Sequence, residues 1–306
     1  MSTRQYRRKA SLMIGTDADA LDLSQLRFTF VARRGNLQTP NTLRLKVYNP
    51  SPTTVSKTMK EFKRVVLSAG YEGNFGSIFD GTVKQVRFIR ESPTDTYLDI
   101  AAADGDGAYN FSIIRQTMAA GSTFSEHVGA IGNAMASRGI SLGVMTTLPS
   151  TVFPRGKVMF GLARDQLRGT ARSVGSDWYI DNGRLNVVAQ TAYLPGDVPE
   201  INYRTGMIGM PTQTIGGIEL TMLLNPSIRI GQAIKLNNDS IQRYEQTAAS
   251  DKAGADAEKS HTGINSDGMY KVTQAEHTGD SRGNDWHSKV IAVDIDETMK
   301  PVAAKP

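Results

Sequence analysis

Few residues in this sequence have the types and spacing that catalysis or metal binding requires. Cysteine is absent, which excludes a thiolate nucleophile, a CxxC redox pair, a disulfide framework and a zinc site with sulfur ligands. Two of the four histidines, His277 and His287, lie near Asp280 and Asp294 in the sequence. Imidazole and carboxylate groups bind zinc, but this spacing does not match a helical i, i+4 pair. We therefore expect loop and strand histidines, and no metal site.

A short acidic segment, Asp104-Gly105-Asp106-Gly107, resembles the start of a calcium-binding loop. Such a loop needs an oxygen ligand at its fifth position and a glutamate at its twelfth. Here these positions hold Ala108 and Arg115, so the match fails. The segment is typical of a turn that ends a strand.

Other catalytic signatures are also missing. The sequence contains no GxxxxGK[ST] phosphate loop, no GxSxG elbow and no HExxH helix, and Arg155-Gly156-Lys157 lacks the glycine-rich loop that makes a lysine a phosphate ligand. Paired carboxylates for glycoside hydrolysis need an aromatic-lined cleft, which the sequence does not indicate around its glutamates. We expect no cofactor.

Composition and charge narrow the class of protein further. Of 306 residues, 39% are hydrophobic, and 35 Lys and Arg against 30 Asp and Glu give a net charge of +5. This excess is too small and too dispersed for a typical nucleic-acid binder. No run of apolar residues is long enough for a transmembrane helix, and the basic segment Arg4–Lys9 precedes no apolar stretch of a signal peptide. We expect a solvated arm over residues 1–24; contact of this arm with nucleic acid is the alternative.

A period of two dominates the first third of the chain. Apolar residues alternate with polar ones around residues 26–30 and 43–47, on either side of a turn-like cluster, Arg33-Arg34-Gly35-Asn36. Further strands are predicted over 64–71, 77–91 and 96–104. After Ser51 and Pro52, a short helix is predicted to place Val55, Met59 and Phe62 over the sheet. Residues 25–111 thus predict a small β-barrel or β-sandwich domain.

The middle third changes to a helical period. Thr123 and Glu126 form a capping box at the start of a helix that ends near Gly139. A second helix is predicted from Leu162 to Val174. Asn182-Gly183 then lies between two apolar runs, which is a strong hairpin signal. Residues 112–198 therefore predict an α+β domain.

The last third returns to strands, predicted over 215–224, 228–236, 269–277 and 286–293. Residues 199–298 predict a second β-barrel domain, with a polar insertion at 237–267 that has few large apolar residues. The tail, residues 299–306, is expected to fray. The fold class is α+β and mainly β, with two β domains of similar size on either side of an α+β segment.

The order of these segments resembles the baseplate hub proteins of contractile-tailed bacteriophages. The residues that carry the resemblance form eight segments, 43–51, 66–71, 78–83, 103–110, 155–157, 205–211, 223–228 and 277–286.

The resemblance implies a structural protein of the virion tail baseplate, assembled in the host cytoplasm, and not an enzyme. In such hubs, two tube-like barrels per chain form a homotrimer with six similar barrels. This ring adapts the hexameric tail tube to the trimeric central spike during attachment and genome ejection. Its partners are the tail tube protein, the spike and other baseplate proteins, without membrane insertion, and DNA at most passes through the lumen.

A ring of barrels requires exposed strand edges that pair between subunits. We expect assembly contacts in two segments, the polar turn with Asp280, Ser281, Arg282, Gly283 and Asn284, and the segment with Arg204, Met207, Ile208 and Met210. Two alternative functions stay open. A particle-associated peptidoglycan hydrolase would need an acid and base pair in a cleft. A β-barrel nucleic-acid-binding module would bind in a strongly salt-dependent way.

Overall fold

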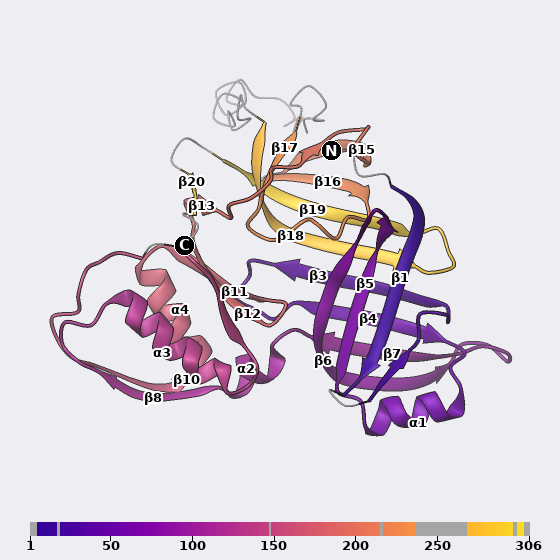
Figure 1. The fold of residues 1–306 in the computed structure, drawn as a ribbon, viewed down its shortest axis with the longest axis horizontal. Coiled ribbons are helices and arrows are strands. Elements are labelled where there is room, and N and C mark those ends of the chain that lie inside the picture. Colours follow the sequence, from indigo (N-terminus) through magenta and orange to yellow (C-terminus); the bar gives the residue numbers. More distant parts are fainter. Residues whose placement is uncertain are drawn as a thin grey trace, which may run out of the picture.

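The computed structural model describes residues 5–16, 19–146, 148–214, 217–236, 268–295 and 299–302. These residues form a mainly β molecule with three lobes (Figure 1). The predicted insertion at 237–267 lies outside the described residues.

The first β region contains seven strands and one helix. They are β1 (Tyr6–Gly15), β2 (Ala20–Asp22), β3 (Phe28–Gly35), β4 (Thr42–Tyr48), α1 (Pro52–Lys60), β5 (Arg64–Glu72), β6 (Asn74–Arg90) and β7 (Thr96–Ala103). The α+β region follows with α2 (Asp106–Phe111), β8 (Ile113–Met118), α3 (Phe124–Ala136), β9 (Ser141–Met145), β10 (Lys157–Leu162), α4 (Ala163–Ser173), β11 (Ser176–Asp181) and β12 (Arg184–Ala189). The second β region contains β13 (Ala192–Tyr193), β14 (Glu200–Ile201), β15 (Met207–Thr214), β16 (Gly217–Leu223), β17 (Ala233–Leu236), β18 (Met269–Asp280), β19 (Trp286–Asp294) and β20 (Lys300–Pro301).

One hydrogen-bonded sheet joins the two β regions. Its main path runs β15-β16-β19-β18-β3-β4-β7-β6-β5-β1-β2, and β17 adds to β18 and β14 to β17. The antiparallel pairing of β3 with β18 connects the two regions directly. Along this path the described strands do not close into a ring of hydrogen bonds, so the sheet is open at β15.

The two β regions repeat the same strand order. In the first region, β3, β4, β7, β6 and β5 are neighbours in that order; in the second, the order is β15, β16, β19, β18 and β17. All of these neighbouring pairs are antiparallel. The chain order within each set is also the same, so the molecule contains one five-strand unit twice. In the sequence analysis, two similar barrels follow only from the family resemblance, because the two copies share a topology and not a motif.

Each lobe has its own hydrophobic core. The first core packs aromatic residues of β3, such as Phe28 and Phe30, against β5, β6 and Trp286 from the second region. The second core is built on β16, β18 and β19. The third lies between α3, α4 and the β11–β12 hairpin around Trp178. The first two cores draw on more than one of the predicted stretches, since the first includes Leu224 and Trp286 and the second includes Tyr179 and Val188.

Most predicted elements are present, with local causes that the sequence contains. Thr123 accepts a hydrogen bond from the Glu126 amide, and the Glu126 carboxylate accepts one from the Thr123 amide, which confirms the capping box. Ser51 caps α1 through the Thr54 amide. Asn182 and Gly183 have positive φ values of 50° and 70°, as a two-residue hairpin turn requires.

Several expectations need correction. Within the predicted arm, Tyr6–Gly15 forms strand β1, which pairs with β5 over its whole length. Arg33 to Gly35 are not a turn, because β3 continues through them to pair with β18. Met59 is not on the buried stripe of α1, where Thr58 is the buried residue. In each case a tertiary partner overrides the local signal.

The last third differs from prediction at three places. Met207–Thr214 is strand β15, which glycines and a proline hide from a pattern search. The strand predicted at 228–236 is shorter, because β17 begins only at Ala233 and the residues before it form a turn and one isolated bridge, between Gln232 and Leu194. In the predicted fraying tail, β20 pairs with β13, and Val302 is buried.

Candidate functional site: a polar junction and open strand edges

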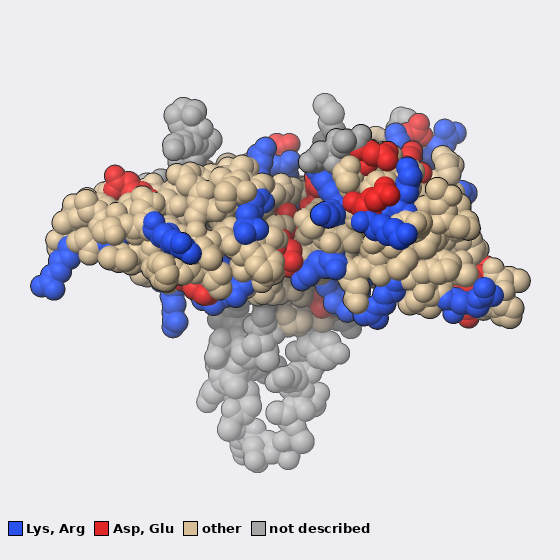
Figure 2. Space-filling model, turned by 90° about the horizontal axis from the view of Figure 1, so that it is seen from below, with Lys and Arg blue, Asp and Glu red and all other residues tan. Residues whose placement is uncertain are grey.

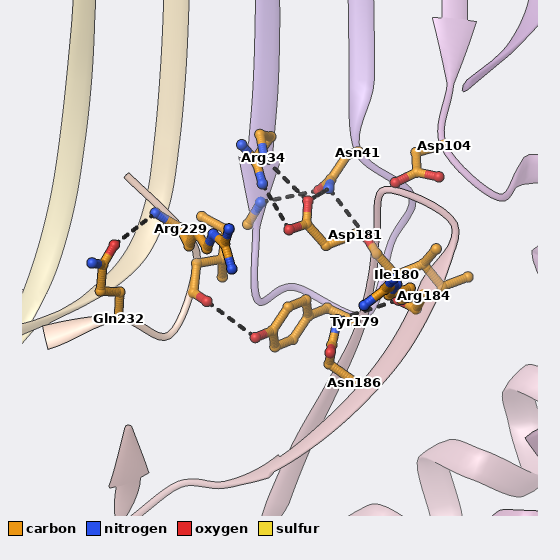
Figure 3. Close-up of polar contacts among 12 residues, drawn as sticks. Arg34, Asn41, Asp104, Tyr179, Ile180, Asp181, Arg184, Asn186, Arg229 and Gln232 are labelled. Atoms are coloured by element: carbon orange, nitrogen blue, oxygen red, sulfur yellow. Dashed lines mark hydrogen bonds and ion pairs between the residues drawn. The ribbon is translucent and has the colours of Figure 1, made fainter. Parts of the chain in front are cut away.

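A buried polar junction holds the α+β region against both β regions (Figure 3). Arg34, at the end of β3, donates two hydrogen bonds to the Asp181 carboxylate, at 3.1 Å from Nε and 2.7 Å from a terminal nitrogen. The Arg34 side chain is 3% exposed. Asn41 donates to the Ile180 carbonyl and to Asp181, both at 3.1 Å. The bidentate geometry and the shared partner fix the β11–β12 hairpin on the first β region.

A second carboxylate lies on the other side of this hairpin. Asp104, at the end of β7, accepts a hydrogen bond of 3.0 Å from the Gly183 amide. Burial raises the pKa of Asp104 to about 6, although this amide and that of Asn182 act to lower it. Asp104-Gly105 thus ends a strand, as the sequence analysis predicts, and Asp104 also holds the hairpin turn.

The same hairpin contacts the second β region. Tyr179 donates a hydrogen bond of 3.1 Å to the Ile230 carbonyl, and burial raises the pKa of its phenol (Figure 3). Lys271 on β18 donates to the Gln190 carbonyl at 3.2 Å, and burial lowers its pKa. The junction therefore fixes all three lobes. Its groups bind one another, so we interpret it as structural.

The histidines and aspartates that the sequence analysis weighs as metal ligands do not form a cluster of three. His277 is fully buried on β18 and contacts Ser288 Oγ through Nδ1 at 2.8 Å. Ser288 Oγ accepts from the Asn225 amide, so its hydroxyl proton is available for Nδ1. Burial lowers the pKa of His277 to about 3, which keeps the ring neutral. In the described part of the chain, no group of three or more His, Asp or Glu side chains is placed to hold a metal ion. No described helix has the length and apolar composition to cross a membrane.

The polar turn between β18 and β19 makes contacts within the chain. Asp280 pairs with Arg27 at 2.8 Å. Burial acts to raise the pKa of Asp280, but Arg27 and the Arg282 amide hold it below its usual value. Ser281 Oγ accepts from the Phe28 amide, Arg282 donates to the Gln25 carbonyl, and Arg8 donates to the carbonyls of Gly283 and Asn284. The turn thus ties β18 to the start of β3 and to β1.

The other predicted contact segment is an open strand edge. Met207, Ile208 and Met210 lie on β15, which pairs only with β16 among the described strands. Ile208 and Met210 are exposed, and Arg204 lies in the preceding turn, with its guanidinium over Tyr203. The structure therefore brings these four residues together at one end of the sheet.

A second open edge is not predicted from the sequence. Strand β6 pairs with β5 through residues 74–82 and with β7 through residues 82–90. Past Thr82, no described strand pairs with the side of β6 that faces away from β7. Phe88 is 48% exposed there, and Arg87 and Arg90 are exposed on either side of it.

The outer face of the β8–β10 pair is also apolar. Val158 and Phe160 are among the most exposed large hydrophobic side chains described, and Arg115 lies over the Phe160 ring at 5.9 Å. Figure 2 shows this lobe as a mostly uncharged surface with scattered Lys and Arg. Nothing in the structure indicates what covers this face.

The fold is similar to those of several solved tail proteins. The structure is similar to a 43 kDa tail protein of prophage MuSo2 from Shewanella oneidensis, with a TM-score of 0.60, 8% identity, and coverage of 97% of this chain and 100% of that one. It is also similar to a tail protein from Neisseria meningitidis MC58, with a TM-score of 0.58, 11% identity, and coverage of 97% of this chain and 100% of that one. A third similar structure is the E. coli c3393 protein, a type VI secretion component described as similar to T4 tail proteins gp27 and gp5. Its TM-score is 0.53, with 11% identity and coverage of 98% of this chain and 80% of that one.

The family itself comes from the sequence. A search of curated proteins found no significant match. The family model for baseplate hub gp41 matches residues 43–241, more than half of the chain. The chain belongs to the baseplate hub gp41 family. Its role is that of a structural component of a tail baseplate, as the resemblance implies.

Proposed function

We propose that this chain is the hub of a contractile phage tail, in which three copies form a ring that joins a hexameric tail tube to a trimeric central spike. Each copy contributes two tube-like barrels, so the ring presents six similar units around a lumen through which DNA passes. The chain is not an enzyme in this proposal. It assembles in the host cytoplasm with the tube, the spike and other baseplate proteins.

The observation that carries this proposal is the repeated five-strand unit. A chain with two equivalent units can match a sixfold partner with only three copies, while its non-repeated α+β lobe keeps threefold symmetry. Family membership supports the baseplate setting. An assembly built from one chain alone needs a sheet that can continue from copy to copy, and the open β15 edge supplies such an end.

The orientation of the sheet supports a polar lumen. Core residues of β3 and the α+β lobe lie on one side of the sheet, and the opposite face carries charged side chains of both signs. On that face Arg33 forms an ion pair with Glu276, and Lys289 forms one with Glu219 at 2.8 Å. We infer that this face lines the lumen and that the α+β lobe points outward. Mixed charges there avoid a strong attraction for passing DNA.

We propose Arg204, Met207, Ile208 and Met210 as the principal assembly contact and the exposed side chains of Arg282 and Asn284 as a smaller one. The experiment is native mass spectrometry of the purified chain over a range of concentrations. A species of three times 33.3 kDa is expected. Six copies would indicate a tube-like assembly instead, and a monomer at every concentration would contradict self-assembly of the ring.

A further inference from the structure

We propose that β15 of one copy pairs, antiparallel, with the distal half of β6 of a second copy, in the place that β3 takes on β18 within the chain. This inference rests on the ring of the proposed function and names the strands and the register of its subunit contact. It follows from the repeat, and each step uses pairings inside one chain.

The first step is the equivalence of β6 and β18. Each is the fourth strand of its unit, and each has one irregularity in its pairing with the fifth. In β6 the register shifts between Val83 and Gln85. In β18 it shifts between Val272 and Gln274. Because the shifts coincide, Gln85 aligns with Gln274, and Phe88 aligns with His277.

The second step is the difference between their outer edges. On the outer edge of β18, residues Gln274–Asp280 pair with β3. The aligned part of β6 begins at Gln85, and no described strand lies there. His277 is 0% exposed and Phe88 is 48% exposed at the equivalent position. Helix α1 lies beside this part of β6 in Figure 1, but it leaves the Phe88 ring half in solvent.

The third step is the equivalence of β3 and β15, the first strands of the two units. Val31 pairs with Arg44, and Thr212 pairs with Glu219. Arg44 and Glu219 pair in turn with Ala101 and Ile291, which stand directly after the two register shifts. Thr212, Gln213 and Thr214 therefore occupy the places of Val31, Ala32 and Arg33.

The register of the new contact follows from these alignments. Val31 faces Thr278, Ala32 faces His277, and Arg33 faces Glu276. Between copies, Thr212 is then expected to face Ile89, Gln213 to face Phe88, and Thr214 to face Arg87. The irregularity between Ile208 and Thr212, which includes Pro211, limits regular pairing to this short stretch.

The chemistry of the two edges fits this pairing. Residues 205–214 contain no charged side chain, although exposed edge strands commonly carry lysine to prevent association. The β6 edge carries Arg87 and Arg90, which would repel a second β6 edge, while Lys84 pairs with Asp106 at 2.8 Å. A neutral edge and a cationic edge can join to each other, and the cationic edge cannot readily join to itself.

The two edges lie at opposite ends of an eight-strand run, from β15 to β6. The proposed contact is therefore heterologous, and it repeats the junction that already joins the two units of one chain. If every junction is the same, each unit is related to the next by the same rotation, so successive units can close into a ring. The contact would also bury the exposed Phe88 ring.

Disulfide trapping tests the register directly, because the chain has no native cysteine. The variants Thr212→Cys and Ile89→Cys are prepared separately and mixed under mild oxidation. Directly opposed residues of antiparallel strands have Cα atoms about 4.5–5.5 Å apart, within the range that disulfides span. The expected product is a covalent dimer of twice 33.3 kDa in the mixture and in neither variant alone.

Two controls define the result. The double variant Val31→Cys/Thr278→Cys places the same pair at the internal junction and should form an intramolecular bond. The mixture of Thr214→Cys with Ile89→Cys is out of register and should give a strongly reduced yield. A dimer from Thr212→Cys alone would indicate pairing between two β15 edges and would overturn the proposal.

Native mass spectrometry of the same variants separates this inference from the proposed function. A trimer that gives no cross-link between Thr212→Cys and Ile89→Cys would refute the β15–β6 pairing and leave the ring intact. A chain that stays monomeric and does not cross-link would refute both.

Discussion

Strands β6 and β18 hold the same position in the two β regions but differ in what lies on their outer edges. The outer edge of β18 is covered by β3, and the buried ring at its centre is His277. The outer edge of β6 is open past Thr82, and the equivalent ring, Phe88, is half exposed. One unit thus shows the completed junction and the other shows the same junction without its second strand. The difference between them locates the surface that a neighbouring copy would cover.

The largest difference in the free energy of unfolding is expected between alanine variants in the two halves of β6. Phe79 is buried in the first core, so Phe79→Ala should lower the free energy of unfolding by about 4 kcal/mol. Phe88→Ala should change that of the isolated monomer by less than about 1 kcal/mol, because its ring is already half hydrated. Urea denaturation of dilute protein measures both values. A loss of several kcal/mol for Phe88→Ala in the monomer would show that this ring belongs to the core.

The next effect concerns two adjacent arginines on β3. Arg34→Ala leaves the Asp181 carboxylate, whose side chain is 15% exposed, without its bidentate partner, and should lower the free energy of unfolding by about 3 kcal/mol. Arg33→Ala removes an exposed ion pair with Glu276 and should cost less than about 1 kcal/mol. Denaturation of both variants at equal ionic strength makes the comparison. Equal losses would contradict the role assigned to the junction.

A smaller effect, with a defined pH dependence, is expected at Asp104. Its pKa is about 6 in the folded chain against an ordinary value of 3.8, so the folded state binds more protons between these values. Stability contributed by this group is therefore lost as pH rises from about 4 to 6. Asp104→Asn keeps an oxygen for the Gly183 amide, and should raise the free energy of unfolding by about 2 kcal/mol near pH 8 and by much less near pH 4.

His277 provides the opposing trend for this measurement. Its pKa of about 3 lies below the ordinary value of 6.5, so the unfolded chain binds the extra proton and stability falls as pH decreases through this window. Asp104→Asn should leave this loss at falling pH in place while removing the loss of stability that accompanies a rise from about pH 4 to 6. An unchanged pH profile in Asp104→Asn would mean that the carboxylate is not buried as described.

Local signals in the sequence were sufficient for much of the fold. The capping box at Thr123, the cap at Ser51 and the Asn182-Gly183 turn each act over a few residues, and all three are confirmed. Alternation also predicts β4, β5 and β7 closely. These elements need no distant partner to specify their conformation.

Elements that depend on distant partners were missed or misread. Residues 6–15 look like a charged arm, and only pairing with β5 makes them a strand. Arg33-Arg34-Gly35 look like a turn, and only β18 and Asp181 explain why two arginines continue a strand. The open edge of β6 has no local signature, because it is defined by where β5 begins, at Arg64. A comparison of the two register shifts is the signal that reveals it.

The smallest effect is expected where the two units differ most in structure. The first unit connects its second and third strands through α1, whereas the second unit uses turns that begin at Asn225. The Asn225 side chain accepts hydrogen bonds of 2.9 Å from the Ser227 amide and of 2.9 Å from the Asn74 side chain. Ser51→Ala removes only the Thr54 contact at the start of α1, and should lower the free energy of unfolding by about 1 kcal/mol. Because Ser51 is exposed, its loss should leave the native mass distribution unchanged. A shift of that distribution would mean that α1 contributes to the subunit contact beside β6, and the proposed register would then have to include this helix.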